Sequence, residues 1–185
     1  MPAWLALAAL VASDVGWERR LSGLGIGEAP SARVLEGCTA VSMNESRGPR
    51  RAWVETGLLA ALNRVGAAPV SSAGALEPQS LATTWICKDP RSSMTIALDA
   101  SGRVSAALAR VPVPVDQSAD RRDAWSPERL APLKNTVRAL GAYGIRVSER
   151  DARGNALGWS ARHNRGRLDA WYAPTQDLIT ILLHR

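Results

Sequence analysis

The run Asp177-Leu-Ile-Thr-Ile-Leu-Leu-His184-Arg185 decides how this chain folds. It is apolar at odd and even positions alike, with Ile179 and Ile181 on one face and Leu178 and Leu182 on the other. Because side chains alternate between the two faces of a strand, a strand that is apolar on both faces is usually covered on both sides. The run therefore predicts a central strand of a sheet, and the fold should not form without it.

The residues before this strand predict one helix and three further strands. Ser126-Pro127-Glu128 is typical of a helix start, with Ser as the cap, Pro at the first helical position and an acid in the first turn. Gly141 ends the helix, and short strands follow over 145–151, 156–163 and 167–173. Residues 127–185 are therefore expected to form a helix and a four-stranded antiparallel meander.

The first half of the chain loosely repeats this order. We predict a strand over 33–43, a helix over 51–64, a strand over 81–87, and a hairpin formed by 93–99 and 103–110. Asp99 and Ser101 before Gly102 are typical of a turn, because short polar side chains bond the local backbone.

The expected fold class is α+β, with an antiparallel sheet built from two helix-plus-meander units. The first unit spans 31–115, and the second spans 127–185. Both helices are expected on one face of the sheet, and the C-terminal strand is expected to be central. Residues 116–126 form the predicted linker, because the alternating prolines before it force extended backbone and its charged residues favour solvent.

Residues 1–13 contain an uncharged apolar run that is shorter than the roughly 20 residues needed to span a bilayer. Two interpretations fit this run. It is a secretory signal removed before Asp14, although Lys and Arg are missing ahead of the apolar part, or it starts a buried helix that continues through Arg20. Residues 14–30 are expected to form a short helix and then a flexible connector rich in glycine.

Cys38 and Cys87 are the only cysteines, and each lies on a predicted strand. They should pair as a disulfide if the chain is exported, and otherwise they are two buried thiols. A disulfide would close a loop of roughly 50 residues and contribute about 4 kcal/mol in the loop-entropy model. Their spacing is not that of a Cys-x-x-Cys redox pair. Two cysteines without a nearby histidine cluster do not form a zinc site, so no metal and no cofactor are expected.

Arginines gather in the second half of a chain whose formal net charge is +6. The candidate anion-binding residues are Arg146, Arg150, Arg162, Arg165 and Arg167, with Trp159 and Trp171 on neighbouring strands. Arg146 and Arg150 are expected to share a face of their strand, and arginines beside aromatic rings bind single-stranded nucleic acid through phosphate contact and stacking. The competing interpretation is that the tryptophans belong to the core and the arginines to a solvated face.

No pattern of a known catalytic centre is present in the sequence. The HExxH, GxSxG and Walker motifs are missing, and the two histidines, His163 and His184, lie at ends of predicted strands, where we expect exposed or edge positions. We therefore assign no catalytic residue, and the sequence does not favour an enzyme.

The layout resembles small secreted or lipoprotein-type bacterial α+β domains. The resemblance rests on the apolar N-terminal run, Gly37-Cys38 on an early strand, the helix at Trp53, Cys87, and the Ser-Pro-Glu helix that leads into a meander. It implies a role in the bacterial cell envelope. The apolar N-terminus, the single pair of cysteines and the lack of a catalytic motif favour a non-enzymatic exported binding or interaction domain, with a protein or an anionic ligand as partner. The alternative is a cytosolic basic domain that binds nucleic acid or another polyanion through the meander 146–167.

Overall fold

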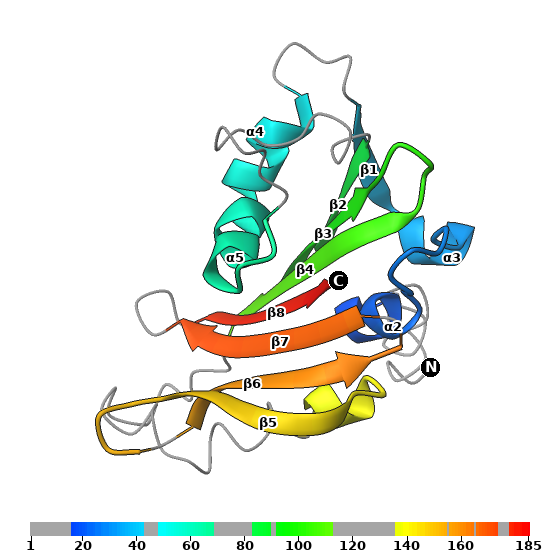
Figure 1. Cartoon of the computed structure of the whole chain (residues 1–185). Helices are drawn as coiled ribbons and strands as arrows, with labels where there is room; N and C mark the ends of the chain where they lie inside the picture. Colours follow the sequence, from blue (N-terminus) through cyan, green and yellow to red (C-terminus); the bar gives the residue numbers. More distant parts are fainter. Residues whose placement is uncertain are drawn as a thin grey trace, which may run out of the picture.

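An antiparallel sheet forms the body of the protein (Figure 1). The computed structural model describes residues 16–42, 48–68, 83–89, 92–112, 136–154, 156–164, 166–173 and 178–185. Within these residues the sheet has eight strands in the order β1-β2-β3-β4-β8-β7-β6-β5. The strands are β1 (Cys38–Ser42), β2 (Thr83–Asp89), β3 (Ser92–Leu98), β4 (Val104–Pro112), β5 (Tyr143–Arg150), β6 (Ala156–His163), β7 (Gly166–Ala173) and β8 (Leu178–His184).

The C-terminal strand β8 lies in the middle of this sheet, which confirms the prediction from its apolar residues. It pairs with β4 on one side and with β7 on the other. Ile181, Leu182 and Leu183 are fully buried, so both faces of the strand are covered. The pairing of β4 with β8 joins the run β1 to β4 and the meander β5 to β8 into one continuous sheet, as expected.

The described helices are short. They are α2 (Trp17–Ser22), α3 (Ala32–Leu35), α4 (Gly48–Glu55) and α5 (Leu58–Arg64), and residues 136–139 are also helical. The predicted helix 51–64 is interrupted at Gly57, whose φ of 79° is left-handed and suits a residue without a Cβ atom. Similarly, α3 replaces the start of the predicted strand 33–43, and Gly37 with a φ of 71° separates it from β1.

The helices do not share one face of the sheet, contrary to the expectation from sequence. Helix α5 packs with Ala106 and Leu108 of β4, whereas Val137 and Leu140 belong to the cluster that contains Ala107 and Ala109 of the same strand. Because successive residues of a strand point to opposite faces, the two helical segments cover opposite faces. We call these the α5 face and the α2 face, since Leu21 of α2 lies in the second cluster. The apolar residues on both sides of β8 require this double cover.

The glycine-rich residues after α2 are part of the core, not a flexible connector as predicted. Leu24 and Ile26 are almost fully buried. The backbone N–H of Gly27 donates to the carbonyl of Val104 at 2.8 Å, and the N–H of Val104 donates to the carbonyl of Glu28 at 2.8 Å. The chain therefore runs along the start of β4, with two apolar side chains as anchors.

Several sequence predictions lie outside the described residues. They are the apolar run within residues 1–13, the linker 116–126, the first part of the helix before residue 136, and Arg165.

Candidate functional site: a groove beneath helix α5

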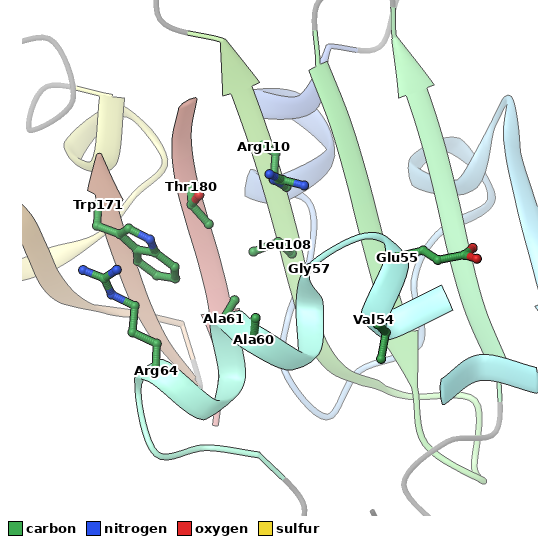
Figure 2. A pocket seen from close by; sticks show the side chains of 10 residues that line it. All are labelled: Val54, Glu55, Gly57, Ala60, Ala61, Arg64, Leu108, Arg110, Trp171 and Thr180. Atoms are coloured by element: carbon green, nitrogen blue, oxygen red, sulfur yellow. The ribbon is translucent and has the colours of Figure 1, made fainter. Parts of the chain in front are cut away.

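A groove of about 510 Å³ opens on the α5 face, between helices α4 and α5 and strands β4, β8 and β7 (Figure 2). Figure 2 shows Arg64 and Trp171 together at one end, Val54 and Glu55 at the other, and Arg110 and Thr180 between them. The lining residues are Val54, Glu55, Gly57, Ala60, Ala61, Arg64, Leu108, Arg110, Trp171 and Thr180. The volume falls within the range of about 300–1,000 Å³ that is usual for small-molecule sites.

Strand pairing brings the floor of the groove together from distant parts of the sequence. Arg110 on β4 is the direct partner of Thr180 on β8, and Thr180 is the direct partner of Trp171 on β7. Direct partners in antiparallel strands point to the same face. The three side chains therefore form one row across the middle of the sheet.

Helices α4 and α5 form the opposite wall of the groove, and the small side chains of Ala60 and Ala61 leave the groove open. Ala60 and Ala61 precede Arg64 of α5 by four and three positions, so both lie near Arg64 on the helix surface. The helix begins at Gly57, where a Cβ atom would lie 3.7 Å from Nη1 of Arg110, so the start of α5 approaches the guanidinium closely.

A cation–π contact between Arg64 and Trp171 forms one end of the groove. The guanidinium carbon of Arg64 lies 4.8 Å from the centre of the Trp171 ring. Arg64 also forms an ion pair with Glu149 on the edge strand β5. A guanidinium fixed over an indole ring presents its remaining N–H groups in a defined direction.

The groove combines charged groups with apolar surface. Its charged groups are two guanidinium groups and the Glu55 carboxylate, and its apolar surface comes from Leu108, the two alanines and Trp171. Thr180 is the hydroxyl among the described lining residues, and these residues contain no histidine or cysteine to activate it. The arrangement fits an anion with an apolar body.

The predicted anion-binding residues separate into several places. Arg146, Arg162 and Arg167 are exposed on the α5 face, on three neighbouring strands. Arg150 lies at the β5–β6 turn, where its Nη1 donates to the carbonyl of Gly154 at 2.7 Å. The pairing of β5 with β6 shifts register twice between Val147 and Arg150, so the strand is irregular between Arg146 and Arg150.

The two predicted tryptophans do not form a shared stacking surface. Trp159 is 5% exposed and belongs to the core of the α2 face. Trp171 is 7% exposed, belongs to the cluster of the α5 face, and is covered by Arg64. The burial of Trp159 therefore supports the interpretation that it belongs to the core.

Both histidines are buried, which corrects the expectation of exposed or edge positions. His184 is 3% exposed, and its Nε2 lies 2.7 Å from Oδ2 of Asp169 on β7. Burial would raise the pKa of Asp169, but hydrogen bonds from His184 and Ser160, with the charges of His184 and Arg167, lower it overall. Asp169 is thus a buried carboxylate that its neighbours keep ionised.

Burial lowers the pKa of His163 below 6.5, although a hydrogen bond with the backbone of Leu140 opposes the shift. The unfolded chain therefore binds more protons than the folded chain just below this value, and stability is lost as the pH falls. We expect urea unfolding to show a larger loss of stability between about pH 7.5 and pH 5 in the native protein than in His163→Gln. Equal losses in the two proteins would contradict this assignment. The lowered pKa of Asp169 adds a loss of stability only below about pH 4, where the unfolded chain binds more protons at this carboxyl than the folded chain does.

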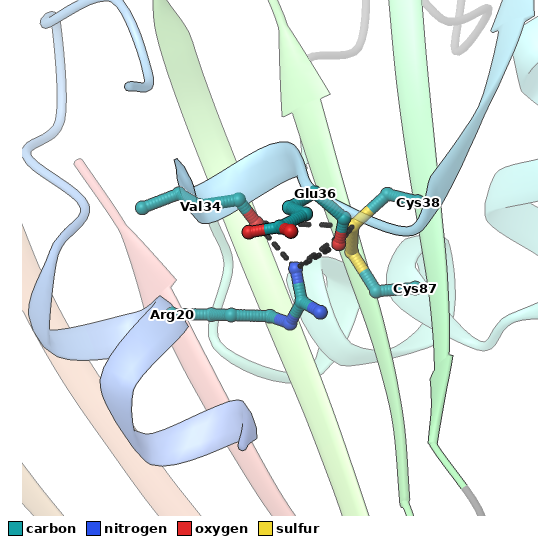
Figure 3. The surroundings of a disulfide bond; sticks show 5 residues. All are labelled: Arg20, Val34, Glu36, Cys38 and Cys87. Atoms are coloured by element: carbon teal, nitrogen blue, oxygen red, sulfur yellow. Dashed lines mark hydrogen bonds between the residues drawn. A yellow bond between two sulfur atoms is a disulfide. The ribbon is translucent and has the colours of Figure 1, made fainter. Parts of the chain in front are cut away.

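A disulfide joins the edge strand β1 to β2 (Figure 3). Cys38 and Cys87 are direct partners in the β1–β2 register, and their sulfur atoms lie 2.02 Å apart. Nη1 of the buried Arg20 donates to the carbonyls of Val34 and Glu36, at 2.6 and 2.8 Å. The same nitrogen lies 3.3 Å from Sγ of Cys38, so α2 and the α3–β1 turn enclose the bond.

No group of three or more His, Cys, Asp or Glu side chains among the described residues is placed to hold a metal ion. None of the described helices has the length and apolar character needed to cross a membrane.

Comparison of the chain with family models, curated proteins and solved structures finds no match.

Proposed function

We propose that this protein is a non-enzymatic binding domain of the bacterial cell envelope that takes an anionic ligand in the groove beneath α5. The observation that carries the proposal is an open groove in which Arg64, Arg110 and Thr180 lie beside an apolar floor and Trp171. Concave sites that combine apolar surface with a few placed polar groups are the usual form of small-ligand sites.

The charges of the groove favour an anion. An arginine in a partly enclosed site binds a carboxylate, sulfonate or phosphate through charge-assisted hydrogen bonds, which are stronger than those between neutral groups. Arg110 lies at one end of the row formed with Thr180 and Trp171, and Leu108 of the same strand also lines the groove. A ligand with an acidic group at Arg110 and a flat apolar body along Leu108 and Trp171 would use all of these features.

The disulfide supports a location outside the cytoplasm. Disulfides persist in oxidising compartments such as the periplasm and are rare where glutathione and thioredoxin keep thiols reduced. The uncharged apolar run within residues 1–13 is consistent with export, as is the resemblance to secreted bacterial domains.

The alternative function is nucleic-acid binding in the cytosol through the meander 146–167. The exposed Arg146, Arg162 and Arg167 favour it. Binding of single strands without sequence preference also relies on aromatic rings that stack on bases. Trp159 and Trp171 are both buried, so neither offers an open ring, and the alternative is the weaker of the two.

Anilinonaphthalene sulfonate is a suitable probe, because it combines an aromatic body with one fixed anionic group. We expect saturable fluorescence enhancement with the folded protein and an affinity about tenfold lower in Arg110→Gln, since a charge-assisted hydrogen bond contributes about 1.5–3 kcal/mol. Ala60→Glu should have a similar effect, because it places negative charge and bulk in the groove.

The matched control is Arg33→Gln, which removes the same charge from an exposed position on α3, away from the groove. Near-ultraviolet circular dichroism must show that each variant is folded, because the dye also binds partly folded states. Equal affinity in the native protein, Arg110→Gln and Ala60→Glu would overturn the groove as the ligand site.

A further inference from the structure

The α5 face carries a second group of arginines, separate from the groove. Arg162 on β6 and Arg167 on β7 are direct cross-strand partners, and Tyr143 on β5 is the partner of Arg162 on its other side. Arg146 pairs with Ser160 in the next row. We call Arg146, Arg162 and Arg167 the arginine strip. Neighbouring strands lie about 4.8 Å apart, so the strip is a compact array of cations.

The arginine strip has a surplus of positive charge, because the described residues offer its arginines too few acidic partners. Like charges directly opposite one another on antiparallel strands are destabilising, which makes the pairing of Arg162 with Arg167 unfavourable without a ligand. Among the described residues, neither Arg146 nor Arg162 has a hydrogen bond or ion pair. The nearby Glu149 is paired with Arg64.

The acidic residue within these rows is already engaged. Asp169, the partner of Ser160, is buried and bonded to His184. Ser160 in turn accepts a hydrogen bond from Nη2 of Arg167 at 2.9 Å. This bond orients Arg167 on the surface, where its charge also acts on the buried Asp169 carboxylate. The strip therefore presents exposed cations, one of which is already positioned.

We propose that the arginine strip, with Tyr143 beside it, binds an acidic polysaccharide. The strip lies on an open sheet surface, which suits an extended polymer better than a small molecule. Carboxylate and sulfate groups match the planar, forked donors of arginine. Tyr143 is 56% exposed and offers a flat amphipathic ring against which a sugar can pack.

Two observations favour a polysaccharide over nucleic acid. The tryptophans that would stack on bases are buried, which leaves Tyr143 as the exposed ring next to the strip. The disulfide fits an oxidising compartment outside the cytosol, which disfavours cytosolic nucleic acid as the partner. The proposal does not depend on the groove, because the strip and the groove have no residue in common.

The test uses three labelled polymers: a heparin fragment with sulfates, polygalacturonate with carboxylates, and oligothymidylate with phosphates and bases. Fluorescence anisotropy is measured with the native protein and with Arg162→Ser/Arg167→Ser at low and at physiological salt. The control double variant, Arg33→Ser/Arg138→Ser, removes the same charge from exposed positions of the helices on the other side of the sheet.

We expect heparin or polygalacturonate to bind the native protein. The affinity should fall at least thirtyfold in the strip variant and less than threefold in the control, because only the strip variant loses two charge-assisted contacts to the polymer. The dye affinity of the groove should stay unchanged in the strip variant. Equal losses in the two double variants, tighter binding of oligothymidylate than of both glycans, or no binding of either glycan at low salt would each overturn the proposal.

Discussion

Deletion of β8 is expected to abolish folding. The strand pairs along its whole length with β4 and with β7, and it is the element that joins the two halves of the sheet. A chain that ends at Asp177 exposes the apolar faces of both neighbours and loses the side chains Ile181, Leu182 and Leu183 from the core. We expect it to lack near-ultraviolet circular dichroism and a cooperative urea transition, while a cooperative transition near the native midpoint would contradict the central role of β8.

A milder change in the same strand gives a measurable loss. Ile181 is fully buried, and Ile181→Ala should lower the free energy of unfolding by about 2–5 kcal/mol, which is the usual cost of this truncation in a packed core. The matched control is Val147→Ala on the edge strand β5, where the side chain is 40% exposed and the loss should be below about 1 kcal/mol.

Reduction of the disulfide is expected to cost about 4 kcal/mol of stability in the loop-entropy model, since the two cysteines are separated by 49 positions. The bond ties the edge strand β1 to the sheet, so its loss should release β1 first. Urea unfolding of the native protein with and without reductant measures the difference directly.

The control for this prediction is Cys38→Ala/Cys87→Ala, which should match the reduced native protein and should not respond to reductant. Identical unfolding midpoints for the oxidised and the reduced native protein would show that the disulfide contributes nothing to stability.

Much of the sheet could be predicted from local patterns. The β3–β4 hairpin is recognisable because Asp99 accepts hydrogen bonds from the backbone N–H groups of Ser101 and Arg103, as short polar side chains before a glycine do. The meander β5 to β8 is recognisable from alternation and glycine turns. Central β8 follows from its two apolar faces.

Other features depend on tertiary contacts that local patterns do not encode. The segment around Leu24 and Ile26 has the composition of a connector, yet β4 supplies backbone partners that hold it against the core. The helices were expected on one face, although a strand with two apolar faces needs cover on both. His163 is a polar residue that was expected at an exposed or edge position. It is buried, and it forms a hydrogen bond with the backbone of Leu140.

The groove could not be predicted from spacing, because Arg110, Trp171 and Thr180 come from separate strands that only the β4–β8 and β7–β8 pairings bring together. One signal was present in the sequence. Arg110 and Thr180 are polar positions within apolar strands, and polar residues on central strands often mark a site. The tryptophans were ambiguous, since packing and stacking require the same residue type.

The most direct test of the proposed envelope function is the intact mass of the native chain from a secretion-competent bacterial host, alkylated before and after reduction. The proposal predicts a chain that starts at Asp14 and takes up no alkylating agent at Cys38 and Cys87 until it is reduced. A chain that starts at Met1 and is alkylated at both cysteines without reduction would contradict export. Cytosolic nucleic-acid binding would then become the leading hypothesis.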